Sequence, residues 1–283
     1  MSSETQSESE GAFAGAEGLN IFYRAWRPAS PSRGVVVIAH GFNSHSGHYL
    51  WAGEQFAQAG LAAYALDHRG RGRSDGERYW VETFDHYEAD LHAFVQLVRA
   101  REPGLPIFLL GHSAGGVISC VYALDHQAEL AGLICESFAF EVPAPAFALA
   151  VIKGLSHIAP HAQVLKLPNE GFSRDPKVVE ALNADPLIAH EVQPTHTVAE
   201  MVRADERLKR EFPLITLPVL ILHGGADKVT RPEGSRAFHD AAGSADKTLK
   251  IYEGHVHDLL NDIGREVVLN DIIAWIEARL SPA

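Results

Sequence analysis

Short apolar runs recur along the chain, and their alternation with segments of helical periodicity restricts the fold more than any other feature. The runs are VVVIA, LAAYALD, IFLLG, AGLICES, PVLILH and KTLKIY. Runs of this length, bounded by turn residues and often rich in β-branched side chains, are typical of strands buried on both faces. Strands that alternate with helices form a parallel sheet covered by helices on both sides. We therefore expect an α/β fold, in which a mostly parallel central sheet is flanked by helices.

The alternation breaks in the middle of the chain. Residues 138–212 contain Pro-interrupted helical pieces and no clear strand, and this segment is too long for a plain loop. We expect it to be a helical cap, inserted after the sixth strand of an α/β core that comprises residues 13–137 and 213–283. Residues 1–12 are rich in Ser and Glu and cannot bury much apolar surface, so we expect a disordered tail there.

Charge and composition exclude several classes of protein. The formal net charge is −12, whereas a general nucleic-acid binder needs a basic surface that displaces counterions. The N-terminus has neither the basic start nor the apolar stretch of a secretory signal. Cys120 and Cys135 lie in apolar runs, which favours buried free thiols and a reducing compartment. We expect no nucleic-acid partner and a cytoplasmic location.

Sixteen histidines invite a metal-binding hypothesis, which the spacing does not support. The close pairs are His45/His48, His157/His161 and His255/His257, and none is accompanied in sequence by third and fourth ligands. We therefore expect no metal and no cofactor.

A serine between small residues marks the candidate nucleophile. Gly111-His112-Ser113-Ala114-Gly115 stands where the run IFLLG passes into a helical segment. A serine flanked by glycines at a strand-to-helix turn is held in a tight backbone conformation that exposes its hydroxyl above the sheet. The alternative role, an ordinary helix N-cap, accounts for the serine but not for both glycines.

A serine hydroxyl needs a general base, and the base needs an acid that orients it. In a parallel α/β sheet these groups come from loops after strands, in the order Ser, acid, His. Asp227 lies in the loop after the run VLILH, and either His255 or His257 after the last strand can be the base. The backbone N–H groups of Phe42 and Ala114 are the candidate oxyanion donors, because both lie beside strand ends near the nucleophile.

An arginine-rich loop, Arg69-Gly-Arg71-Gly-Arg73, raises the alternative of phosphate or nucleic-acid contact. It lacks the spacing of a dinucleotide fingerprint. We expect these arginines to pair with neighbouring acids, namely Asp67, Asp75 and Glu77.

With these residues in place, the chain resembles the monoacylglycerol lipase and lysophospholipase branch of the α/β-hydrolase superfamily, from about Leu19 to Leu280. The segments that carry the resemblance are HGFNSHSGHY (40–49), DHRGRGRSDG (67–76), GHSAGG (111–116), NADPL (183–187), VLILHGGADKV (219–229) and DKTLKIYEGHVHDLLND (246–262). The resemblance implies a triad of Ser113, Asp227 and His257, so that His257 rather than His255 is the base. It also implies an oxyanion hole formed by Phe42 and Ala114.

Four further residues are candidates for substrate binding. Glycerolipid-cleaving members often have arginine before the tyrosine of the HSG-x-Y segment, where this chain has His48. Phe138, Phe147 and Ile152 belong to an apolar stretch that suits an acyl-chain tunnel under a mobile lid, or that only packs the cap onto the core.

Together these features predict a serine hydrolase that cleaves carboxylic esters with an apolar acyl group, through an acyl-enzyme. Monoacylglycerols and similar lipid or short-chain esters are the expected substrates. Lysophospholipids, other carboxylic esters, amides and lactones are alternatives, because the same triad serves all of them. A fold that binds ligand without turnover is a further alternative. We expect a small-molecule partner and transient contact of the cap with a lipid interface, hence a peripheral association with membranes.

Overall fold

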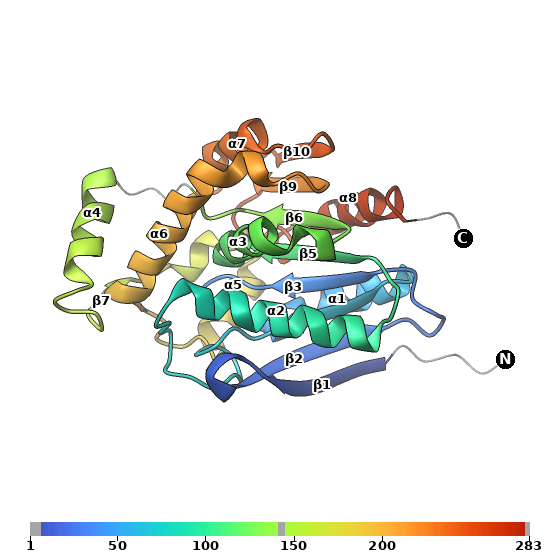
Figure 1. Ribbon diagram of the computed structural model, residues 1–283, viewed down its shortest axis with the longest axis horizontal. Helices are drawn as coiled ribbons and strands as arrows, with labels where there is room; N and C mark the ends of the chain where they lie inside the picture. The colour runs from blue at the N-terminus through green and yellow to red at the C-terminus, as the bar shows by residue number, and fades with distance from the viewer. Residues whose placement is uncertain (1–6, 141–144, 281–283) are drawn as a thin grey trace.

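The computed structural model describes residues 7–140 and 145–280. Its core is an eight-stranded sheet in the order β1-β2-β4-β3-β5-β6-β9-β10 (Figure 1). The strands are β1 (Ser7–Ala14), β2 (Asn20–Arg27), β3 (Val35–Ala39), β4 (Ala62–Leu66), β5 (Ile107–His112), β6 (Gly132–Glu136), β9 (Val219–Gly224) and β10 (Lys247–Tyr252). Strands β1–β2 and β2–β4 pair antiparallel, and every other neighbour in the sheet is parallel. The predicted fold class is confirmed.

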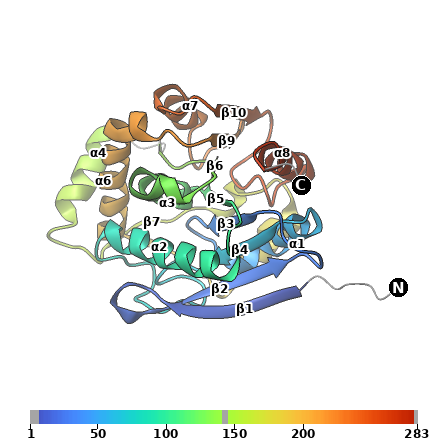
Figure 2. The same cartoon turned by 45° about the vertical axis from the view of Figure 1, so that its right-hand side comes forward.

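Helices cover both faces of this sheet, as Figure 2 shows. One face packs against α1 (Leu50–Gln58) and α8 (Arg265–Glu277), and the other against α2 (Phe84–Arg101), α3 (Ala114–His126) and α7 (Pro232–Ala241). Strand β3 explains why the apolar runs are continuous. Val35 and Val37 point into one hydrophobic cluster and Val36 and Ile38 into the other, so every residue of the strand is buried.

The segment between β6 and β9 forms a cap at one end of the sheet (Figure 1). It contains α4 (Ala146–Leu155), β7 (Gln163–Leu165), α5 (Pro176–Ala184), β8 (Gln193–Pro194) and α6 (Thr195–Glu211). Helix α6 packs against α3 of the core and α4 of the cap. The sequence predicts no strand here, whereas β7 and β8 form a small antiparallel pair, which is too short to produce a recognisable pattern.

The expected disordered tail over residues 1–12 is wrong from Ser7 onward, because β1 begins there. The strand gains its order mainly from backbone pairing with β2 and from charge pairs, since Glu10 contacts Arg24 and Arg73. Its apolar contribution is small: Phe13 is buried and stacks on Phe94 at 5.3 Å. Residues 1–6 of the expected tail lie outside the described residues.

Two further properties concern the thiols and the helices. Cys120 and Cys135 are both buried and are not joined by a disulfide; their sulfur atoms lie 3.5 Å apart, within hydrogen-bond distance. Within the described part of the chain, none of the helices combines the length and apolar character that crossing a bilayer requires.

Candidate active site

Ser113 sits at the sharp turn between β5 and α3. Its backbone has φ 53° and ψ −119°, a conformation that non-glycine residues rarely adopt. Neighbouring glycines make room for this turn. A Cβ on Gly115 would lie 2.1 Å from the Ala39 carbonyl oxygen, and one on Gly41 would lie 2.8 Å from the Ser113 Cβ. The strained turn therefore requires both glycines and presents the serine hydroxyl above the sheet edge.

Three side chains from three strand ends form one hydrogen-bonded chain. His257, after β10, has its Nε2 2.9 Å from the Ser113 Oγ and its Nδ1 2.8 Å from Oδ2 of Asp227, which follows β9. The side chains of His257 and Asp227 are fully buried. His255, the other candidate base, instead has its Nδ1 3.4 Å from the carbonyl oxygen of Glu253. The structure thus brings together the three residues that the resemblance implied.

Asp227 is surrounded by hydrogen-bond donors. Its Oδ1 accepts from the backbone N–H groups of Val229 and Thr230, and its Oδ2 accepts from the Thr230 hydroxyl at 2.8 Å. His223 places its Nε2 3.1 Å from the same Oδ2. Burial alone would raise the pKa of Asp227, but His257 and His223 hold that pKa below its usual range. The carboxylate is therefore ionised near neutrality, as the orienting acid of a histidine base must be.

His223 and Thr230 were not anticipated from the sequence. The His223 Nδ1 lies 2.7 Å from the Ser235 hydroxyl. When that hydroxyl donates its hydrogen bond to Nδ1, the ring proton of His223 is on Nε2 and is directed at Asp227. The available signal was position, because His223 is the penultimate residue of β9 and lies four residues before Asp227.

Phe42 and Ala114 lie beside Ser113 and line the same cavity. Ala114 is the first residue of α3, whose N-terminal N–H groups point toward the site. Phe42 belongs to the loop after β3, which His40 braces: its Nδ1 lies 2.7 Å from the Gly41 oxygen, and its Nε2 accepts the His68 N–H at 3.0 Å. Burial holds the pKa of His40 well below its usual value, so this brace is a neutral imidazole.

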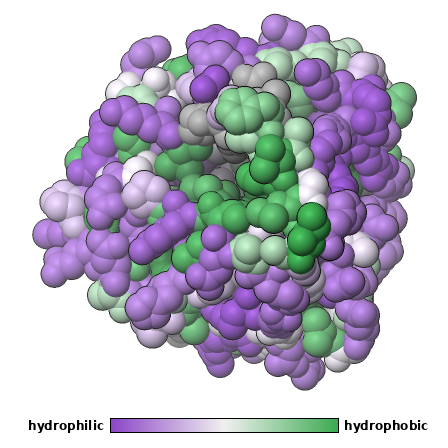
Figure 3. All heavy atoms as spheres, turned by 90° about the vertical axis from the view of Figure 1, so that its left-hand side faces the viewer, coloured by the Kyte–Doolittle hydropathy of each residue, from purple (hydrophilic) through white to green (hydrophobic). Residues whose placement is uncertain are grey.

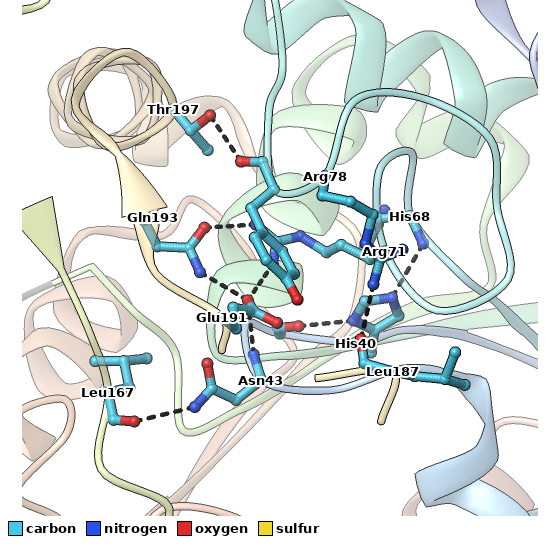
Figure 4. A network of polar contacts seen from close by, with 12 residues as sticks. His40, Asn43, His68, Arg71, Arg78, Leu167, Leu187, Glu191, Gln193 and Thr197 are labelled. Atoms are coloured by element: carbon cyan, nitrogen blue, oxygen red, sulfur yellow. Dashed lines mark hydrogen bonds and ion pairs between the residues drawn. The ribbon is translucent and has the colours of Figure 1, made fainter. Parts of the chain in front are cut away.

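A buried polar network fixes the loop that carries Phe42 (Figure 4). The Asn43 N–H donates to Glu191 at 3.0 Å, and Glu191 also pairs with Arg71. The Arg71 guanidinium donates to Gln193 at 2.7 Å and lies 4.3 Å from the centre of the Phe42 ring. This network joins the core to the cap, since Glu191 and Gln193 precede α6.

The expected partners of the arginine loop are therefore wrong. Arg69 pairs with Asp90 and Glu17, Arg71 with Glu191, and Arg73 with Glu10. Asp67 and Asp75 accept backbone N–H groups instead, from Ser46, Arg73 and Asn20. Glu77 lies 3.1 Å from His161 of the cap. Residues distant in sequence supply the counter-charges, which local spacing could not indicate.

A cavity of about 650 Å³ opens over Ser113 between the core and the cap. Its walls are mainly apolar: Phe42, Ser113, Ala114, Ala139, Leu149, Ile152, Val164, Leu165, Leu167, Pro168, Glu170, Gly171, Val198, Met201, Val202, Asp205, Lys228, Val229 and Thr230. Of the four expected substrate-binding residues, only Ile152 is among them. Figure 3 shows apolar side chains gathered around a hollow on this face of the molecule.

The other three expected substrate-binding residues lie elsewhere. Phe138 is fully buried among Phe140, Phe212 and Phe238, so it packs the core beneath the cap. Phe147 is 73% exposed on the outer side of α4. The His48 Nε2 lies 2.9 Å from Asp185 Oδ2, which ties the loop after β3 to the cap.

The His45 Nε2 lies 2.8 Å from the same Asp185 oxygen as His48, so these residues form one of three groups of potential metal ligands within the described residues, which the sequence did not reveal. The His45 Nδ1 accepts the Gly47 N–H, so its Nε2 carries a proton directed at Asp185. A histidine that binds a metal through one ring nitrogen usually donates a hydrogen bond from the other, whereas the Nδ1 of His45 accepts one. His45, His48 and Asp185 therefore form a hydrogen-bonded contact between the core and the cap.

Comparison with known proteins places the chain in a family. Residues 30–264 match the model of the family described as serine aminopeptidase, S33 (Hydrolase_4). The chain belongs to this family. A monoacylglycerol lipase of Mycolicibacterium smegmatis is 35% identical over 279 residues, which are 98% of this chain and 99% of that relative. Among solved structures, a Paleococcus ferrophilus monoacylglycerol lipase has 28% identity and a TM-score of 0.81, covering 97% of this chain and 99% of its own. A thermostable Bacillus coagulans carboxyl esterase in complex with glycerol has 26% identity and a TM-score of 0.88, covering 98% and 100%.

Proposed function

We propose that this chain is a serine hydrolase that cleaves monoacylglycerols through an acyl-enzyme, with Ser113 as nucleophile, His257 as base and Asp227 as orienting acid. The observation that carries the proposal is the hydrogen-bonded chain of Ser113, His257 and Asp227 at the floor of an apolar cavity. The similarity to monoacylglycerol lipases over nearly the whole chain supports the substrate class.

In the proposed reaction, His257 Nε2 takes the proton of Ser113 as Oγ bonds to the ester carbonyl carbon. The backbone N–H groups of Phe42 and Ala114 stabilise the oxyanion that forms. As the tetrahedral intermediate collapses, the bond to the glycerol oxygen breaks, and His257 returns the proton to that oxygen. A water molecule then loses a proton to His257 and attacks the acyl carbon. Ser113 leaves with the proton, and a fatty acid is released.

The cavity accounts for the preference for an apolar acyl group, because mainly apolar walls favour a hydrocarbon chain over water. Other carboxylic esters form the second candidate substrate class, which the likeness to the Bacillus coagulans carboxyl esterase favours.

We further infer that the cap contacts lipid aggregates, so that the protein associates peripherally with its substrate phase. Three large apolar residues on or just after α4 support this inference: Phe147, Val151 and Ile158 are 73%, 62% and 84% exposed. Exposed apolar residues grouped on one element typically mark an interaction surface. We also propose a cytoplasmic location, which the two buried cysteines without a disulfide support.

Substitution of the proposed base and its neighbour tests the assignment. We expect Ser113→Ala and His257→Gln each to lower kcat on 2-oleoylglycerol and on p-nitrophenyl butyrate by about 10⁴-fold or more. His255→Gln is the matched control and should retain activity, because the His255 ring is not part of the hydrogen-bonded chain of Ser113, His257 and Asp227. Labelling by a fluorophosphonate probe should follow the same pattern. Undiminished turnover in Ser113→Ala would refute the mechanism, and loss in His255→Gln alone would move the base to His255.

A further inference from the structure

One face of α6 forms a wall of the cavity above Ser113. Val198, Met201, Val202 and Asp205 all line the cavity, and their spacing of three, four and seven residues places them along one side of the helix. Leu149 and Ile152 of α4 line the cavity from the neighbouring helix. Asp205 is therefore a carboxyl group in a stripe that is otherwise apolar.

One oxygen of the Asp205 carboxyl group lacks a partner. This atom, Oδ1, is shielded from solvent and has no hydrogen bond within the described residues. The nearby cations are engaged elsewhere: Arg203 with Glu200, Arg207 with Asp125 and Glu211, and Lys153 with Glu206. Burial, assisted by the charge of Glu206, raises the pKa of Asp205 well above its usual value. A raised pKa favours the protonated carboxyl group, which offers a hydrogen-bond donor as well as an acceptor.

The remaining charged residues at the cavity belong to a different part of its wall. Lys228 directly follows Asp227, and Glu170 is in the η4 turn (Asn169–Gly171), whose Gly171 lies against Val229. Both are exposed and adjoin the catalytic loop, whereas Asp205 lies on the helical wall formed by α6. Asp205 is therefore placed to meet the acyl chain.

An unsubstituted hydrocarbon chain would leave this carboxyl unsatisfied, whereas a hydroxyl could both accept from it and donate to it. Sites that hydrogen-bond a substrate hydroxyl discriminate strongly against analogues that lack it, because their own polar groups are then left unpaired. We propose that Asp205 forms a polar subsite in the acyl cavity and that the enzyme favours esters whose acyl chain carries a hydroxyl group. This inference rests on the proposed function, since it assigns the acyl chain to this cavity.

The test compares hydroxylated and plain acyl chains in the same enzyme preparation. The substrates are p-nitrophenyl dodecanoate and a series of monohydroxydodecanoates that differ in hydroxyl position, all used below their aggregation concentrations. The readout is the ratio of kcat/KM for each hydroxylated ester to that for the plain ester, because this ratio does not depend on the fraction of folded enzyme. We expect the wild type to favour at least one hydroxyl position.

Two substitutions of Asp205 separate hydrogen bonding from volume. Asp205→Leu should lower the favourable ratio by about 10-fold or more, since it removes donor and acceptor. Asp205→Asn retains both at nearly the same size and should keep most of the preference. Glu180→Gln is the control, because Glu180 is exposed on α5 and is not among the residues that line the cavity; it should leave the ratio unchanged. An equal ratio in wild type and Asp205→Leu at every hydroxyl position would overturn the inference.

Failure of the proposed function gives a different result. If the wild type cleaves none of the esters, the hydrolase assignment fails, and the subsite is judged by calorimetric binding of dodecanoic and hydroxydodecanoic acids to the same variants. Tighter binding of a hydroxy acid that is lost in Asp205→Leu would support the subsite, and equal binding would refute it. If esters are cleaved without any hydroxyl preference, the subsite alone is refuted.

Discussion

Glu191 holds the loop after β3, which carries Phe42, through a direct hydrogen bond from Asn43. Its Oε1 accepts from the Asn43 N–H, from Arg71 and from Gln193. The side chains of Glu191 and Arg71 are only 1% and 2% exposed. A buried charge pair of this kind need not add stability over an apolar pair, but removing one member leaves an uncompensated charge. Asn43 follows Phe42, so the same contact bears on the proposed oxyanion donor.

We expect Glu191→Gln to lower the free energy of unfolding by about 3 kcal/mol, because the Arg71 charge would then be buried without a counter-charge. The loop should also lose order, so kcat on p-nitrophenyl butyrate should fall more than KM rises. Urea denaturation and steady-state kinetics measure the two effects. Glu180→Gln, an exposed substitution on α5 of the cap, is the control and should be neutral. A change of less than about 0.5 kcal/mol in Glu191→Gln would contradict the assigned role.

Residues at strand ends could be assigned from the sequence, and residues held by long-range contacts could not. Ser113 and Asp227 lie in the loops just after buried strands, so the order of the strands was sufficient to predict them as site residues. The choice of His257 over His255 came from resemblance alone, because both lie in one loop. Thr230 could not be predicted, because its hydroxyl reaches Asp227 only through the conformation of the loop after β9.

Among the elements, those with a long periodic pattern were predictable. Helix α2 (Phe84–Arg101) has such a pattern, because its buried apolar residues recur every three or four positions: Phe84, Tyr87, Leu91, Phe94, Val95 and Val98. Strand β1 was missed because its residues alternate weakly and most are exposed; it is ordered by pairing with β2. Strands β7 and β8 are three and two residues long, which is below what a sequence pattern can reveal.

Helix α4 carries the apolar surface of the cap, and its contribution can be isolated. We expect Phe147→Ser and Val151→Ser together to slow hydrolysis of dispersed 1-oleoylglycerol several-fold, because less apolar area would enter the lipid surface. Hydrolysis of soluble p-nitrophenyl acetate should not change, since Phe147 and Val151 are not among the residues that line the cavity.

Val267→Ser on α8 is the matched control, because Val267 is 59% exposed on an element remote from the cap. It should leave both rates unchanged. Equal losses on dispersed and soluble substrates in the α4 variant would argue against interfacial contact and for a role in packing the cap.

At the scale of the whole molecule, the histidines concern stability more than catalysis. His40, His68 and His112 are almost completely buried. Burial, together with the charge of Arg71, lowers the pKa of His68 to about 3, and burial lowers that of His112 to about 4. Burial also holds the pKa of His40 well below its usual value. The folded protein therefore keeps these rings neutral at pH values where the unfolded chain would protonate them.

Stability should consequently fall on mild acidification. Unfolded histidines titrate near pH 6.5, so below that pH the unfolded state binds more protons than the native state, and the free energy of unfolding decreases as pH falls toward 4. Each buried neutral histidine contributes at most about 1.4 kcal/mol per pH unit to this slope. Urea denaturation at pH 7, 6 and 5 measures it. His68→Gln should show a slope smaller by about one such contribution, whereas Val267→Ser, an exposed substitution on α8 that removes no titratable group, should retain the wild-type slope. An identical slope in all three proteins would mean that His68 is protonated equally in the folded and unfolded states, which its burial beside Arg71 does not permit.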